Sequence, residues 1–207
     1  MIDAAVAAAF FGAAVLLALS PGPDNLFVLM QSATHGRRAG LLVTLGLCTG
    51  LLGHTAAVAL GLAAVLAATP WALWAVKLVG AAYLLYLAWR AWHAPVGPLA
   101  SAHVTRLTPL AAYTRGIVMN LTNPKVALFF LAFLPQFVDP ARGGVPWQIV
   151  QLGALFMLAT LLTFGAFALF AGWIGSGLRR SARAQRLLNR AAALVFAGLA
   201  ARLALAR

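Results

Sequence analysis

Long apolar runs fill most of the chain, and short polar segments separate them. Several runs reach the roughly 20 residues that a helix needs to cross a bilayer, and they lack the alternation of a β-barrel strand. Lipid offers the backbone no hydrogen-bond partner, so such spans form helices. The pattern predicts an all-α membrane protein with six transmembrane helices, at about 4–34, 39–67, 71–92, 113–138, 147–175 and 187–205.

The basic residues predict how these spans are oriented. Arginines gather at 35–38, beside the linker 93–112 and at 179–190, whereas the alternate loops carry few. Loops rich in arginine and lysine stay in the cytoplasm. We therefore expect a multi-pass protein of the bacterial inner membrane with both termini in the periplasm.

A net charge of +12 would suggest nucleic acid as the partner of a soluble protein, but 63% of these residues are hydrophobic. The arginines lie between apolar spans and form no continuous stripe or binding motif. We expect contact with anionic membrane lipid and no nucleic acid. A homo-oligomer is compatible with the pattern.

The proline-rich linker 93–112 divides the chain into repeat halves at about 1–92 and 113–207, within a single membrane domain. Three spans in each half would invert the second half relative to the first. In span two, Gly46 and Gly50 form a GxxxG pair that would let another helix approach closely.

Spans one and four are each interrupted by proline. "SPGPDN" (20–25) and "NLTNPK" (120–125) lie inside otherwise apolar runs. Proline removes a backbone donor, and it fits the first turn of a new helix. The first span would be about 46 Å long as one helix, against a hydrocarbon core of about 30 Å. The sequence predicts that both spans are broken.

Each break is followed by a charge, Asp24 in the first span and Lys125 in the fourth. Counting residues to the cytoplasmic end places both charges about 16 to 18 Å deep, near the midplane. An unpaired charge there costs about 2.5 to 3.5 kcal/mol or more. We expect Asp24 and Lys125 to be partners, either as a structural ion pair or as a substrate and coupling site of a transporter.

The chain resembles the lysine exporter and homoserine/threonine exporter (LysE/RhtB) family of bacterial amino-acid efflux proteins. The matching segments are "PGPDN" (21–25), "GRRAG" (36–40), Gly46, Gly50 and His54 followed by Leu60-Gly61, "KLVGAAYLLYLAW" (77–89) and "NLTNPKVALFFLAFLPQF" (120–137). They occur in order over about two thirds of the chain. The resemblance implies six spans, no cofactor, and export of neutral or basic amino acids such as homoserine, threonine, leucine or lysine by proton antiport.

The same resemblance implies that transport depends on the motif residues around the two breaks. With the polar residues beside them, the candidate substrate-binding and coupling residues are Pro21, Gly22, Pro23, Asp24, Asn25, His54, Asn120, Asn123, Pro124 and Lys125. We expect Lys125 and the helix N-termini to receive the substrate carboxylate. Asp24 and the carbonyl end of the preceding helix would receive the amino group or a proton.

Other readings of the polar residues stay open. His54 either bonds a neighbouring helix in packing or carries protons. Ser20 with His54 is the only nucleophile and base pair worth naming for a membrane enzyme, and no enzyme motif frames it. The single cysteine, Cys48, excludes a paired-thiol carrier. A metal or other small-solute exporter is the further alternative, although no cluster of metal ligands lies in the spans.

Overall fold

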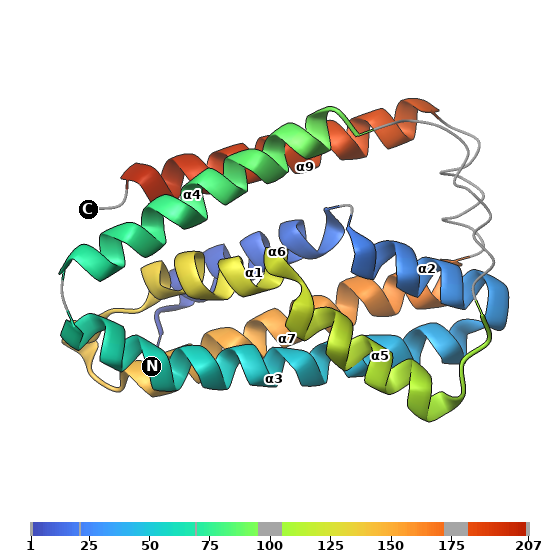
Figure 1. The fold of residues 1–207 in the computed structure, drawn as a ribbon, viewed down its shortest axis with the longest axis horizontal. Helices are drawn as coiled ribbons and strands as arrows, with labels where there is room; N and C mark the ends of the chain where they lie inside the picture. Colours follow the sequence, from blue (N-terminus) through green and yellow to red (C-terminus); the bar gives the residue numbers. More distant parts are fainter. Residues whose placement is uncertain (1, 21, 69, 95–104, 172–181, 206–207) are drawn as a thin grey trace.

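The computed structural model describes residues 2–20, 22–68, 70–94, 105–171 and 182–205, and all of its regular elements there are helices. Figure 1 shows most of them lying along one long axis. In chain order they are α1 (Ala4–Leu19), α2 (Pro23–His35), α3 (Arg37–Ala68), α4 (Pro70–Trp92), α5 (Pro109–Thr122), α6 (Pro124–Leu128), the π-helix η1 (Phe129–Phe133), the 3-10 helices η2 (Leu134–Phe137) and η3 (Pro140–Arg142), α7 (Val145–Leu169) and α9 (Ala182–Leu205). The prediction of an all-α fold is confirmed.

Both predicted helix breaks are present. The chain bends by 63° between α1 and α2, and by 49° between α5 and the segment Pro124–Phe137. Within the described ranges, α3, α7 and α9 contain stretches long and apolar enough to cross a bilayer, and each bent pair adds one candidate span. α4, with 23 residues, corresponds to the predicted third span, 71–92, and its crossing stays a prediction.

The start of the fourth span differs from the prediction. We expected the linker to reach 112, but α5 begins at Pro109. The side-chain oxygen of Thr108 accepts a hydrogen bond from the backbone N–H of Ala111 at 3.2 Å, which caps the helix. Threonine followed by proline is a strong helix start, so the last four residues of the predicted linker, 109–112, form the first turn of α5.

The two halves contact each other in exchanged pairs. α1 packs on α7, as α5 packs on α3; α2 also packs on α7, as η1 packs on α3. α3 pairs with α7, α4 pairs with α9, and Figure 1 shows the members of each pair running in opposite directions. This exchange is the one expected of two inverted three-helix halves. The boundaries 1–92 and 113–207 stay a prediction.

A cluster of phenylalanines holds the first half of span one against the second half of span four. The ring of Phe10 lies 5.7 Å from that of Phe129 and 5.2 Å from that of Phe137. Phe156 of α7 lies 5.2 Å from Phe129. These contacts fix the end of α1 close to the start of α6, where the two breaks meet.

Glycines let α3 and α5 approach closely. A methyl group on Gly46 would overlap the backbone of α5 at Tyr113, and one on Gly116 would overlap the backbone of α3 at Val43. A methyl group on Gly50 would overlap the side chain of Asn120 of α5. The packing role predicted for Gly46 and Gly50 is confirmed, and the partner helix belongs to the same chain.

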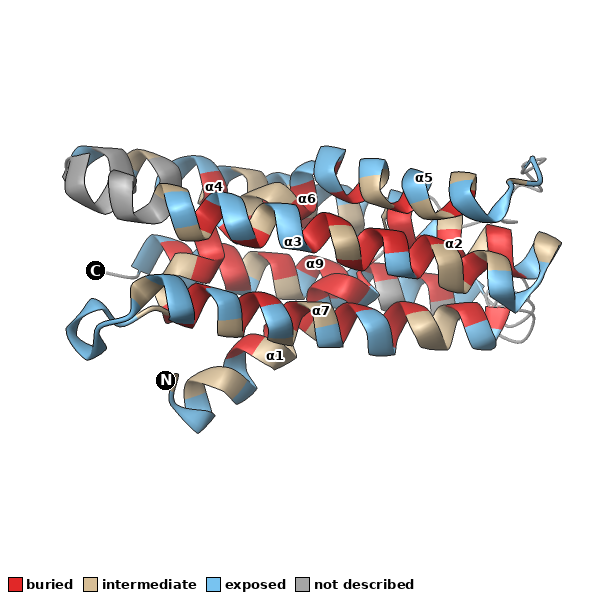
Figure 2. Cartoon of the chain, turned by 90° about the horizontal axis from the view of Figure 1, so that it is seen from below, coloured by how far each residue is buried: buried red, intermediate tan, exposed pale blue. Residues whose placement is uncertain are grey.

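Apolar side chains also cover the outside of the bundle. Figure 2 shows buried residues along the inward faces of α3 and α7 and exposed residues on their outward faces. Leu45, Leu52 and Leu60 of α3 are exposed, Leu60 by 81%. Exposed leucines in these numbers suit contact with lipid, as expected of a membrane protein.

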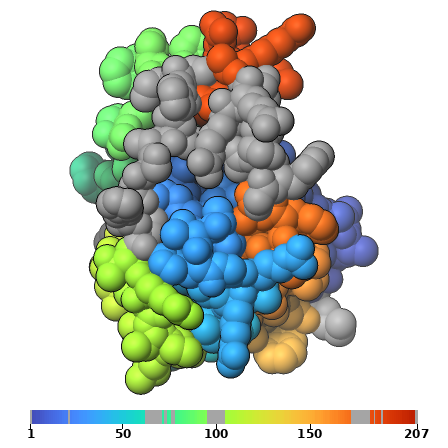
Figure 3. Space-filling view, turned by 90° about the vertical axis from the view of Figure 1, so that its right-hand side faces the viewer, coloured from blue at the N-terminus to red at the C-terminus, as the bar shows by residue number. Residues whose placement is uncertain are grey.

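The two ends of the bundle differ in charge. α1 begins and α9 ends at the same end of the molecule (Figure 1), where Arg142 pairs with Asp139 at 3.2 Å and with Asp3 at 3.9 Å. The other end, seen in Figure 3, brings together α2, the start of α5 and the end of α7. The arginines at 37–38 and Arg106 belong to this second end, and no acidic residue lies near them in the sequence.

Candidate functional site

The first break joins the end of α1 to the start of α2. α1 ends at Leu19, with Ser20 as its cap, and α2 starts at Pro23 after an extended Gly22. The side-chain amide of Asn25 donates to the backbone oxygen of Ala18 at 2.6 Å, which fastens the two helices to each other across the break. Pro21, one of the predicted site residues, lies outside the described residues.

The second break is built around Asn123. Its side-chain oxygen accepts from the backbone N–H of Lys125 at 3.0 Å and so caps α6. Its backbone N–H donates to the backbone oxygen of Asn120 at 3.1 Å. Pro124 occupies the first position of the new helix. The sequence NPK therefore combines a cap, a helix start and a charge in three consecutive residues.

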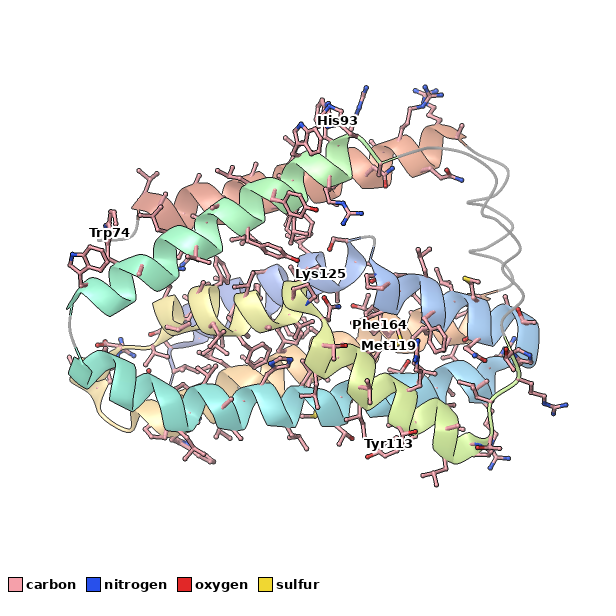
Figure 4. All side chains as sticks on the ribbon, viewed as in Figure 1. Trp74, His93, Tyr113, Met119, Lys125 and Phe164 are labelled. Atoms are coloured by element: carbon pink, nitrogen blue, oxygen red, sulfur yellow. The ribbon has the colours of Figure 1, made fainter. Side chains whose placement is uncertain are left out.

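The charged end of Lys125 lies at the end of α1 and not beside its own helix, α6. Its ammonium donates to the backbone oxygens of Leu17 at 3.2 Å and Ser20 at 3.1 Å, and to the Ser20 hydroxyl at 3.1 Å. These acceptors lie at the C-terminal end of α1, where the helix dipole favours a cation. Figure 4 shows Lys125 beside this end of α1. The unfavourable dipole at the start of α6 is avoided because the side chain reaches across to the other break.

Asp24 makes a different contact from the one that we predicted. The side-chain amide of Asn123 donates to its Oδ2 at 2.8 Å, and within the described ranges Asp24 and Lys125 form no direct ion pair. The expected pairing is wrong in this respect. Carbonyl oxygens satisfy Lys125, and Asn123 bonds both Asp24 and the Lys125 backbone, so the charges are coupled through the amide.

The two charged side chains are buried, with 3% of Asp24 and 9% of Lys125 exposed. The second carboxylate oxygen of Asp24, Oδ1, has no hydrogen-bond partner in the described part of the protein. The side-chain oxygens of Asn25 and Asn120 are also buried and without partners there. Buried polar atoms normally have partners, so these oxygens can accept hydrogen bonds from a ligand, a proton carrier or water.

His54 lies near the second break. Its Nε2 lies 3.2 Å from the backbone oxygen of Asn120, and its ring lies 5.5 Å from that of Phe130. This is the contact that the packing interpretation predicts, and it does not test whether His54 carries protons. The structure does not bring His54 to Ser20, because the Ser20 hydroxyl bonds Leu17 and Lys125.

A cavity of about 290 Å³ opens beside the breaks. Five of the predicted site residues line it, namely Gly22, Pro23, Asn123, Pro124 and Lys125. Two of these lining residues are next to Asp24: Pro23 precedes it in the chain, and Asn123 donates a hydrogen bond to its carboxylate. The cavity therefore adjoins the buried carboxylate. The structure therefore brings the two proline motifs to one cavity.

The other wall of this cavity was missed by the sequence analysis. α4 contributes Tyr83, Leu87, Arg90 and Ala91, Ala94 follows the end of α4, and α9 contributes Asn189 and Phe196. The α4 residues recur every three or four positions and so share one helix face. That spacing was visible in the sequence, but nothing in the sequence placed this face opposite the breaks.

The described residues contain no group of three potential metal ligands among histidine, cysteine and acidic side chains. Cys48 is buried. The arrangement at the breaks offers instead an oxygen acceptor, a cation held by carbonyls and an adjoining cavity. Such a site can recognise a small polar solute through hydrogen bonds and charge.

The chain is similar to known membrane transport proteins. A family model described as LysE type translocator matches residues 15–207. A leucine efflux protein of Enterobacter sp. (strain 638) is 31% identical over 193 residues, with 92% of this chain and 91% of the relative covered. One of Salmonella choleraesuis (strain SC-B67) is 32% identical over 198 residues, with 92% and 91% covered.

A further relative is a membrane protein of Vibrio cholerae serotype O1, 30% identical over 178 residues that cover 86% of each chain. No solved structure matches the chain significantly.

Proposed function

The chain belongs to the LysE type translocator family, and we propose that it is a secondary-active exporter of amino acids from the bacterial cytoplasm, driven by proton antiport. The leucine efflux relatives match over more than nine tenths of both chains. A transporter is therefore favoured over an enzyme. Leucine and similar neutral amino acids are the first substrates to test, ahead of basic ones.

One observation carries this proposal. Asp24 is buried at the first helix break, with Oδ2 held by Asn123 and Oδ1 without a partner in the described residues. It adjoins a cavity lined by both proline motifs. Interrupted helices that face each other across a cavity are the usual arrangement of a transporter site. An ionisable residue buried in a membrane-spanning segment is energetically costly, and such residues usually mark functional sites.

The mechanism follows from these contacts. Asp24 Oδ1 accepts a hydrogen bond from the substrate ammonium in one state and holds a proton in the other, so the two cargoes compete for one oxygen. Asn123 keeps the carboxylate in place in both states because its amide is fixed by the second break. Alternating access would come from one three-helix half rocking against the other.

The orientation is proposed from charge. The end of the bundle with arginines 37–38 and Arg106 would face the cytoplasm, because positively charged loops stay inside. At the opposite end Arg142 is offset by Asp3 and Asp139. Both termini would then lie in the periplasm of a cell with an inner membrane.

Counterflow into proteoliposomes tests the proposal. Vesicles that contain the purified protein are preloaded with one of the twenty amino acids, and uptake of the same labelled amino acid is followed. We expect accumulation above that of protein-free vesicles for leucine or another neutral amino acid. Accumulation for none of the twenty would contradict the proposal.

A further inference from the structure

We propose that Arg90 binds the carboxylate of the substrate, and that the wall formed by α4 and α9 selects an amino acid with an uncharged, apolar side chain. This inference rests on the proposed function, since it names the substrate class of the same cavity. It changes the expected role of Lys125, to which we had assigned the carboxylate.

Lys125 has no donor left for a carboxylate in this structure. A lysine ammonium has three donors, and three oxygens at the end of α1 lie within 3.2 Å of it. Binding a substrate carboxylate would require Lys125 to give up a contact that also favours the dipole of α1. Another cation on the cavity wall would avoid that cost.

Arg90 is that cation. It lines the same cavity as Lys125 but belongs to α4. The chain has three acidic residues, of which Asp3 and Asp139 pair with Arg142 and Asp24 bonds Asn123. The guanidinium lies 5.9 Å from the ring centre of Tyr86, and within the described part of the chain it makes no hydrogen bond or ion pair. Arginine matches the geometry of a carboxylate with two parallel hydrogen bonds.

The rest of the wall is suited to an apolar side chain. Leu87 and Ala91 flank Arg90 on α4, and Phe196 faces the cavity from α9. The side-chain amide of Asn189 lies 3.4 Å from the backbone oxygen of Ala94, and it joins α9 to the end of α4. A substrate with its carboxylate at Arg90 and its ammonium toward Asp24 would place its side chain against this wall.

The charges of the cavity also exclude one substrate class. Arg90 and Lys125 both line it, and the Asp24 carboxylate that adjoins it is already assigned to the substrate ammonium. The side chain of a basic amino acid would meet two like charges, which would repel it. The cavity therefore favours neutral amino acids over lysine or arginine.

The alternative is that Arg90 is only a cytoplasmic charge that sets the topology. Arg115 provides a matched control, because its guanidinium lies 5.8 Å from the ring centre of Phe27 and it is not among the residues that line the cavity. R115Q removes the same charge from the same end of the molecule. An effect on transport that R90Q shows and R115Q does not would therefore arise from the place of Arg90 in the cavity, and not from the loss of a positive charge.

The test compares leucine with leucinamide, which lacks the carboxylate, as competitors of labelled leucine counterflow. In the wild type and in R115Q we expect leucine to compete at least about tenfold better than its amide, because a charge-assisted bidentate contact is lost. In R90Q that preference should fall close to one, and the KM for leucine should rise at least about tenfold. R90K, which keeps the charge without the planar fork, should show an intermediate preference.

R90Q that folds and keeps the wild-type preference for leucine over leucinamide would overturn the inference while leaving the proposed function standing. A wild type without any amino-acid counterflow would contradict the proposed function itself. If R90Q does not fold, measurements on R90K and on the wild type test the carboxylate contact instead. Leucine should raise the melting temperature of the wild type and leucinamide should not, and an unchanged KM in R90K would refute the carboxylate contact.

Discussion

The side-chain amide of Asn123 donates a hydrogen bond to the carboxylate of Asp24 at 2.8 Å, across the two broken helices of the protein. The residues are 99 positions apart in the chain and belong to opposite halves. The same side chain caps α6 through the backbone N–H of Lys125. One amide thus fixes the position of the carboxylate, the start of a helix and the relation between the two breaks.

The first prediction concerns this amide. Asn123→Ala removes a helix cap, worth about 1 kcal/mol, and a hydrogen bond to a buried carboxylate, worth about 1.5 to 3 kcal/mol. We expect a lower melting temperature and loss of counterflow. Thr108→Ala is the control, because it removes the cap of α5 at a distance from the breaks. Equal transport in the two variants would show that Asn123 acts only as a cap.

The second prediction concerns Lys125 and separates a structural pair from a binding site. If Asp24 and Lys125 were merely compensating charges, combining Asp24→Asn with Lys125→Gln would restore what each single variant loses. Their contacts run to different partners, so we expect no such rescue. Melting temperature and counterflow of the two singles and the double measure this. A stable double variant with near-normal transport would leave only a structural role.

Lys125→Gln alone should also destabilise the protein. Glutamine cannot supply three donors to the end of α1, and each carbonyl left without a partner costs about 1 to 3 kcal/mol. The lower melting temperature of Lys125→Gln is measured in the same melting experiments as the single and double variants above.

The third prediction concerns His54. Glutamine can preserve a hydrogen bond to the backbone oxygen of Asn120 but cannot titrate. Because the contact is that of a packed histidine, we expect His54→Gln to keep both expression and the response of uptake to an imposed pH gradient. Loss of the pH response with expression intact would give His54 the proton-coupling role instead.

The fourth prediction concerns helix packing. Gly116→Ala places a methyl group against the backbone of α3 at Val43, and overpacking of this kind costs about 1 to 3 kcal/mol. We expect a clear fall in melting temperature. Gly165→Ala in α7 serves as the matched control, since nothing lies within 4 Å of its added methyl group. A similar change in the two variants would contradict the close approach of α3 and α5.

Much of this architecture could be predicted from the sequence. Apolar runs identify helices, and proline followed by a charge identifies a break, so Pro23, Asp24, Pro124 and Lys125 were all recognised. The GxxxG pair at Gly46 and Gly50 was also assigned to packing. These signals are local, and local patterns are sufficient for elements of this kind.

Two features could not be read from the sequence, for a physical reason. A lysine side chain is long enough to reach several acceptors, and only the folded chain shows that Lys125 reaches the end of α1 instead of Asp24. Likewise, Arg90 looks like an ordinary charge at the end of a span until α4 is packed opposite the breaks. Which helix faces meet is decided by the whole bundle, not by the residues around a motif.

The measurement that tests the central claim most directly is amino-acid counterflow by Asp24→Asn, compared with the wild type in the same vesicles. The substitution keeps the size of the side chain and an oxygen that can accept from Asn123, so folding should be retained, as melting temperature and monodispersity would show. It removes the charge that we assign to the substrate ammonium and the proton. We predict that counterflow falls to the level of protein-free vesicles. A folded Asp24→Asn protein that exchanges amino acids at the wild-type rate would contradict the account.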